Sequence, residues 1–89
     1  MNVMESVNVR GAVLETIGQV LADGGRNSQP IEAGVELRST LGLDSLDLAV
    51  TVVRLEQRLG VDPFRTARRN IRTVGDLIAV YEAHLAEST

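Results

Sequence analysis

Apolar residues recur every three or four positions in three separate stretches of the chain, and this spacing restricts the fold more than any other feature of the sequence. In the first stretch these residues are Val9, Val13, Ile17 and Leu21. Such a repeat lines up side chains on one face of an α-helix. We therefore predict a helix from Val7 to Ala22, with Ser6 or Asn8 capping its start and Gly24 following its end.

The other two stretches predict two further helices. The segment from Ser45 to Leu59 is apolar on more than one face, which indicates a helix that is either deeply buried or keeps one face for a partner. The segment from Thr73 to about Glu87 has the i, i+3, i+4 repeat of an amphipathic helix. Thr73 and Asp76, three residues apart, resemble a capping box at its start.

Two connections complete the chain. Residues 24–44 form a long connection that contains several Gly residues and one Pro, so no regular element is expected there. Its apolar residues can anchor it on the helices; they are Ile31, Val35, Leu37, Leu41 and Leu43. The basic segment 65–72 is predicted to contain a short helix. The expected fold class is all-α: a small four-helix bundle of three main helices plus a short third helix.

Composition narrows the function classes. A length of 89 residues predicts one domain, residues 1–89, with little interior for an enclosed active site. The net charge is −3, and because a mildly acidic chain does not favour the phosphate backbone, nucleic acid is not an expected partner. Cys is absent, no secretory signal is visible, and no stretch approaches the ~20 apolar residues of a membrane span. We expect a cytoplasmic monomer that does not contact membranes. It is either a free-standing protein or a domain excised from a larger protein.

The start of the second helix carries the residues of greatest functional interest. Asp44 and Asp47 flank Ser45 and can satisfy free backbone N–H groups in the first turn, which is an ordinary structural role. A Ser hydroxyl at a helix start is also accessible to a modifying enzyme. A phosphodiester placed there would meet exposed N–H groups and a favourable helix dipole, although the two Asp residues would repel it.

The segment Leu41-Gly42-Leu43-Asp44-Ser45-Leu46-Asp47 resembles the attachment motif of acyl carrier proteins. The resemblance continues through residues 52–61 and through Thr73-Val74-Gly75-Asp76-Leu77, so it spans about residues 35–81. It implies that residues 1–89 are a single acyl carrier domain. A phosphopantetheinyl transferase would join 4′-phosphopantetheine, donated by coenzyme A, to Ser45, with Asp44 as a flanking motif residue.

The same resemblance implies the partners. The terminal thiol of the arm would hold acyl groups as thioesters and present them to an acyltransferase, a ketosynthase or other biosynthetic enzymes. The second helix would offer the contact surface, formed by Leu46, Asp47, Val50 and Val53. The competing interpretation is that Val50 and Val53 belong to the core.

Two departures from the family pattern bear on the pathway. Val50 stands where an acid is common, and Arg54, Gln57 and Arg58 dilute the acidity of this helix. Because charge complementarity chiefly sets association rates and partner choice, we expect a specialised pathway, such as polyketide or mixed polyketide–peptide biosynthesis, over general fatty acid synthesis.

The second departure is a basic cluster in the segment before the last helix. It consists of Arg65, Arg68, Arg69 and Arg72. This cluster is either a solvated face or a docking patch for an acidic partner, with Arg68 and Arg69 as the candidate contacts.

Three alternatives from other classes stay open at this point. A peptidyl carrier usually has Gly where Asp44 stands, so Asp44 favours the acyl version. An unmodified helical adaptor would use Ser45 only as a cap. A hydrolase would need Ser45, His84 and an Asp, but no nucleophile elbow is visible, so no enzyme is expected. One His and no Cys leave no expected metal site.

Overall fold

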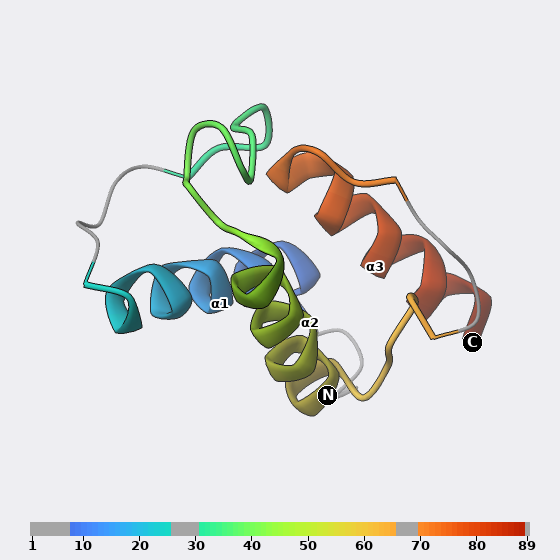
Figure 1. The fold of residues 1–89 in the computed structure, drawn as a ribbon. Coiled ribbons are helices and arrows are strands. Elements are labelled where there is room, and N and C mark those ends of the chain that lie inside the picture. Colours follow the sequence, from blue (N-terminus) through green and yellow to red (C-terminus); the bar gives the residue numbers. More distant parts are fainter. Residues whose placement is uncertain (1–7, 26–30, 66–69, 89) are drawn as a thin grey trace.

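The computed structural model of the chain is an assembly of three α-helices (Figure 1). It describes residues 8–25, 31–65 and 70–88. The helices are α1 (Val9–Asp23), α2 (Ser45–Leu59) and α3 (Val74–Ser88). The predicted all-α fold class is confirmed. Each main helix lies within two residues of its predicted bounds.

The helix ends follow from local side-chain chemistry. Asn8 caps α1, because its side-chain oxygen accepts a hydrogen bond from the Gly11 N–H at 2.9 Å. α2 ends at Gly60, which adopts a left-handed conformation with φ of 77° that favours glycine. At α3, Thr73 and Asp76 exchange backbone–side-chain hydrogen bonds of 3.0 and 3.1 Å. The predicted capping box is therefore present.

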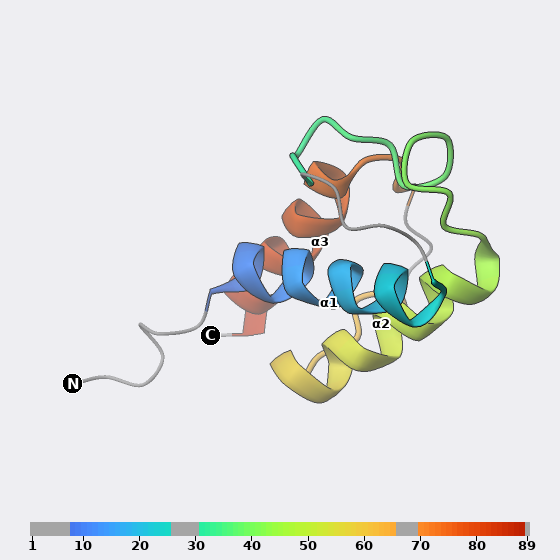
Figure 2. The same ribbon diagram turned by 90° about the vertical axis from the view of Figure 1, so that its left-hand side faces the viewer.

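The core lies between α1 and the rest of the chain. α1 packs against both α2 and α3, whereas these two helices do not pack directly on each other (Figures 1 and 2). The buried apolar side chains are Val9, Ala12, Val13, Ile17, Val20, Leu21, Leu37, Leu41, Leu43, Leu55, Val74, Leu77, Ile78 and Tyr81. α2 contributes one of these residues, so most of its surface lies outside the core.

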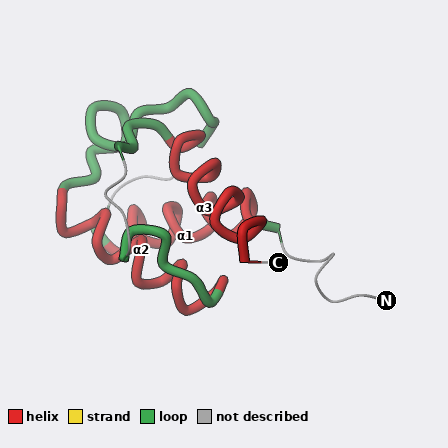
Figure 3. The backbone as a smooth tube through the Cα atoms, turned by 90° about the vertical axis from the view of Figure 1, so that its right-hand side faces the viewer, coloured by secondary structure: helices red, strands yellow, loops and turns green. Residues whose placement is uncertain are grey.

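The connection between α1 and α2 lies across one end of the bundle, beside the start of α3 (Figure 3). Leu37, Leu41 and Leu43 are buried, and Ile31 and Val35 pack against the core at partial exposure. The predicted anchoring role of these five residues is thus confirmed.

Backbone hydrogen bonds hold the same connection to α3. The N–H of Val74 donates to the carbonyl of Val35 at 3.0 Å, and that of Gly75 donates to the carbonyl of Ala33 at 2.8 Å. A Cβ at position 75 would lie 3.0 Å from the Ala33 oxygen, so glycine permits this close approach. These bonds hold the part of the connection around residues 33–35 against the start of α3.

The predicted short helix over residues 65–72 falls largely on residues 66–69, which lie outside the described part of the chain. The described residues of this range, Arg65 and 70–72, are not helical. Just before them, Pro63 is buried and the Phe64 ring packs edge-on against Tyr81 of α3, with ring centroids 6.1 Å apart. This contact holds the segment that leaves α2 against the core.

Candidate functional site

Ser45 is the first residue of α2, and its neighbours form a reciprocal cap. Asp44 is the N-cap; its Oδ1 accepts a hydrogen bond from the Asp47 N–H at 2.8 Å. In return, the Asp44 N–H donates to Asp47 Oδ2 at 3.2 Å. The predicted capping role of both aspartates is confirmed. Because the two carboxylates provide the cap, the Ser45 hydroxyl is left for other contacts, and Ser45 is exposed.

One residue of this site, Arg38, was not predicted from the sequence. Arg38 Nη2 donates a hydrogen bond to Ser45 Oγ at 2.8 Å. Arg38 is the basic residue nearest to Ser45 along the chain. The sequence could have pointed to Arg38 as a lone cation shortly before a helix start that carries two aspartates. Only the fold of the connection shows that its side chain reaches Ser45.

The backbone around Arg38 is held by three hydrogen bonds. The Leu37 N–H donates to the Arg72 carbonyl, and the Leu43 N–H donates to the Leu37 carbonyl, each at 2.9 Å. The Gly42 N–H donates to the Arg38 carbonyl at 3.0 Å, with Gly42 in a left-handed conformation with φ of 73°. These bonds close a turn that places Arg38 beside the start of α2.

Ser45 lies at the meeting point of two surface hollows. One is polar and has a volume of about 360 Å³; its lining residues are Arg38, Gly42, Leu43, Asp44 and Ser45. The other is predominantly apolar and has a volume of about 480 Å³; its lining residues are Ser45, Leu48, Ala49, Val52, Val53, Phe64 and Ile71. A group attached to Ser45 would therefore have a polar surface on one side and an apolar groove on the other.

The outer surface of α2 is apolar and open to solvent. Leu46 is 72% exposed and Val53 is 51% exposed, while Val50 and Asp47 are half-buried. The interpretation of Val53 as a core residue is therefore wrong. α1 packs on the side of α2 that carries Thr51 and Leu55, the residues of this helix that are buried. α2 is thus not deeply buried, and it leaves apolar side chains exposed on one face.

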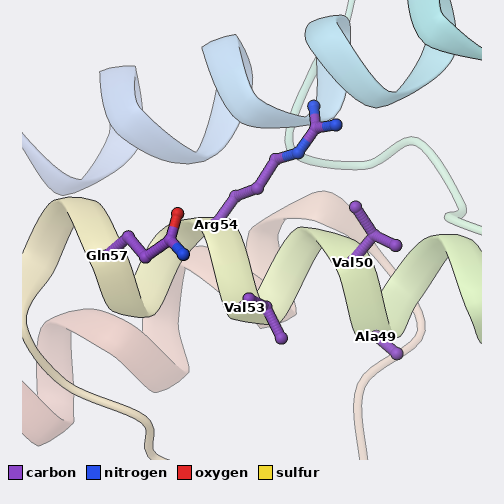
Figure 4. A pocket seen from close by; sticks show the side chains of 5 residues that line it. All are labelled: Ala49, Val50, Val53, Arg54 and Gln57. Atoms are coloured by element: carbon purple, nitrogen blue, oxygen red, sulfur yellow. The ribbon is translucent and has the colours of Figure 1, made fainter.

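The basic residues of α2 are engaged with α1. Arg54 Nη2 lies 2.6 Å from Asp23 Oδ2, and Arg58 Nη1 lies 2.9 Å from Glu15 Oε1. Figure 4 shows Arg54 extending from α2 toward α1, beside a shallow hollow that Ala49, Val50, Val53, Arg54 and Gln57 line. The two arginines offset the acidic residues of α2 in formal charge, and each also forms an ion pair with a carboxylate of α1.

Part of the predicted basic cluster can be placed. Arg68 and Arg69 lie outside the described residues. Arg65 is exposed, and Arg72 Nε lies 3.8 Å from Glu36 Oε2.

No group of three or more metal-ligating side chains is found in residues 8–25, 31–65 and 70–88. Across the same ranges, no helix has the length and apolar character needed to cross a membrane.

A helical domain with an exposed serine at a helix start, an arginine on its oxygen and an apolar groove beside it fits a covalent phosphodiester-linked arm. Comparison with known proteins agrees. Residues 11–80 match the family model of the phosphopantetheine attachment site. The chain is 37% identical over 70 residues to an acyl carrier protein of Saccharopolyspora erythraea, covering 78% of this chain and 74% of that protein.

Two further relatives agree. An acyl carrier protein of Phytoplasma australiense is 37% identical over 60 residues, covering 67% of this chain and 79% of that protein. The solution structure of MacpD, an acyl carrier protein from Pseudomonas fluorescens involved in mupirocin biosynthesis, matches with a TM-score of 0.71 and 34% identity. That match covers 89% of this chain and 84% of MacpD.

The chain belongs to the acyl carrier protein family. Its function is that of a carrier with a covalently attached 4′-phosphopantetheine group.

Proposed function

We propose that Ser45 is the residue that carries the 4′-phosphopantetheine arm. The observation that carries this proposal is the exposed hydroxyl at the first residue of α2, between two aspartates that provide the cap. In the reaction, Ser45 Oγ forms a bond to the phosphorus that bears the pantetheine. The phosphoanhydride bond of coenzyme A breaks, adenosine 3′,5′-bisphosphate leaves with the electron pair, and the serine proton passes to the transferase.

Intact mass tests the attachment site. The protein is incubated with coenzyme A, Mg²⁺ and a broad-specificity phosphopantetheinyl transferase, alongside a control carrier. Wild type should gain the mass of one arm and Ser45→Ala should gain none. Ser39→Ala is the matched control, because Ser39 is an exposed serine near the site whose hydroxyl bonds to Glu36. Unmodified wild type in the presence of a modified control carrier would favour the helical adaptor instead.

We propose further that the cargo is an aliphatic acyl group that rests in the groove between α2, Phe64 and Ile71. The groove begins at Ser45, and apart from Ser45 its lining side chains are apolar. Burial of hydrocarbon stabilises by about 0.8 kcal/mol per CH₂ group, so a longer chain should bind the groove more fully. This favours an acyl over an aminoacyl cargo, because a charged ammonium group would be costly to bury there.

The cargo class is tested by loading the arm with acetyl, octanoyl and glycyl groups. The backbone amide NMR signals of Val52, Phe64 and Ile71 should shift more when octanoyl is loaded than when acetyl is loaded. Glycyl should shift these signals no more than acetyl does. Signals of α1, such as that of Gln19, serve as the internal control. Equal shifts for all three cargoes would reject the groove as the acyl site.

The outer surface of α2 is proposed to dock the enzymes that act on the cargo, with Leu46, Asp47, Val50 and Val53 at the contact. The position of these residues supports the docking proposal. Leu46 is adjacent to Ser45, and the exposed apolar side chains of α2 continue from Leu46 along the helix. Family members act with biosynthetic enzymes, and a partner with an apolar patch would match this surface. Acyltransferases and ketosynthases are the expected enzyme classes, in a specialised pathway.

Alanine substitutions test this docking surface. Leu46→Ala and Val53→Ala should each lower kcat/KM for acyl transfer by roughly 10-fold, as expected for an exposed apolar anchor worth about 1.4 kcal/mol. Glu82→Ala, on the exposed side of α3, is the control. Because the Leu46 and Val53 side chains are apolar, the ratio of each variant's rate to that of wild type should change little when the salt concentration is raised. Unchanged kinetics in both α2 variants would exclude this face.

Arg68 and Arg69 are proposed as a second contact, for an acidic partner surface. This proposal rests on the sequence alone. Replacing both residues with Glu should slow acyl transfer by the cognate enzymes, and an unchanged rate would reject this second contact.

We also propose that residues 1–89 act as one monomeric domain without catalysis of its own. The single core shared by the three helices supports one domain.

A further inference from the structure

Arg38 is placed at Ser45 by the fold, and no carboxylate of the described residues lies within ion-pair distance of it. Three other arginines differ in this respect. Arg54, Arg58 and Arg72 each face an Asp or Glu. The charge of Arg38 is therefore directed at a neutral hydroxyl, next to two aspartates whose side chains are occupied by the helix cap.

A guanidinium on a neutral, exposed hydroxyl contributes little stability to the unmodified protein. The same guanidinium forms stronger, charge-assisted hydrogen bonds with phosphate oxygens, and its planar fork can donate two of them at once. The phosphorus of the arm would be bonded to the very oxygen that Arg38 contacts now. Its free oxygens would consequently lie within reach of the Arg38 side chain.

We propose that Arg38 is a positioning residue that binds the phosphate of the arm after attachment and offsets its repulsion by Asp44 and Asp47. This inference rests on the proposed attachment at Ser45. It assigns different roles to the two hollows that meet there. Arg38 holds the phosphate on the polar side, which Gly42 and Leu43 also line, and so leaves the apolar groove beside α2 for the cargo.

The variants Arg38→Ala and Arg38→Gln test the proposal, the second because it removes the charge but keeps a hydrogen-bonding side chain. Arg38→Lys keeps the charge without the fork. Arg10→Ala is the matched control, since it removes an exposed arginine from α1. Each variant is converted completely to the modified form with coenzyme A, and intact mass verifies the conversion. The readouts are the change in Tm between the unmodified and modified forms and the ³¹P NMR signal of the phosphodiester.

The change in Tm on modification should be more favourable in wild type and Arg10→Ala than in Arg38→Ala and Arg38→Gln. The expected difference is roughly 4 °C, with Arg38→Lys in between. It should shrink in 1 M salt, where the Debye length falls to about 3 Å. The ³¹P signal should move in the two uncharged variants and stay in place in the control.

Two results would overturn the inference while leaving the attachment site intact. One is the same change in Tm and the same ³¹P signal in all variants. The other is failure of Arg38→Ala to accept the arm while wild type accepts it, because Arg38 would then act before attachment. Absence of a mass gain in wild type would instead refute attachment itself, and the inference with it.

Discussion

Replacing Tyr81 with Phe should stabilise this protein. Tyr81 is fully buried on α3, and its hydroxyl has no hydrogen-bond partner among the described residues. A buried polar group without a partner costs about 1–3 kcal/mol. Phe keeps the ring and its edge-on contact with Phe64. We therefore expect Tyr81→Phe to raise the free energy of unfolding by about 1 kcal/mol, which corresponds to a rise in Tm of about 4–8 °C for a domain of this size.

The pH dependence of stability gives a second, independent test of the environment of Tyr81. Burial raises the pKa of Tyr81 well above its usual range, and the carboxylates of Asp62 and Glu56 raise it further. In the unfolded chain the phenol ionises near pH 10. Stability is therefore fully present below about pH 10 and falls at higher pH, by about 1.4 kcal/mol per pH unit until the folded pKa is reached. Tyr81→Phe lacks this loss, so its advantage should grow above pH 10.

Thermal and urea unfolding, followed by circular dichroism from pH 7 to about pH 11, measures both effects. Tyr81 is the single tyrosine, so an ultraviolet absorbance titration of the folded protein reports its ionisation directly. Tyr81→Leu serves as the control, because it removes the ring as well and should destabilise. A Tyr81→Phe protein that is less stable than wild type at pH 7 would refute the reasoning, since the hydroxyl would then have a partner.

Two further predictions concern α2 and α3. Leu55→Ala should cost about 2–5 kcal/mol because Leu55 is fully buried, whereas Val53→Ala should change stability by no more than about 0.5 kcal/mol; urea unfolding of both variants measures the contrast. Hydrogen bonds from the backbone N–H groups of Arg72 and Thr73 hold the pKa of Asp76 below its usual value of 3.8. The stability from this cap is present above pH 3.8 and lost as the pH falls through the lowered pKa, so Tm of Asp76→Asn should depend less on acid than that of wild type.

The predictable parts of this fold are those set by interactions over a few residues. The cap of α2 joins Asp44 and Asp47, three positions apart, and the cap of α3 joins Thr73 and Asp76 in the same way. Such bonds depend on local backbone geometry, so residue type and spacing suffice to predict them. The helix bounds could be predicted from the apolar repeat because that repeat also relates residues only three or four positions apart.

The surface around α2 could not be predicted in this way. Its sequence is apolar on several sides, so periodicity left Val53 open to a core or a surface role. The side that packs was decided by the position of α1, which covers Thr51 and Leu55. The ion pair of Arg54 with Asp23 joins residues 31 positions apart, and a local pattern carries no information about such a contact.

The ion pairs of Arg54 and Arg58 with α1 bear on how the low acidity of α2 is interpreted. This helix contains two acidic and two basic residues, so its formal charge sums to zero. Exposed ion pairs contribute only about 0–1 kcal/mol each, so burial of Leu55 does more to hold α2 on α1 than Arg54 and Arg58 do. Both arginines are paired with carboxylates of α1, so neither directs its charge at the outward face of α2. The docking proposed for this face therefore depends on the fit of exposed apolar side chains such as Leu46 and Val53.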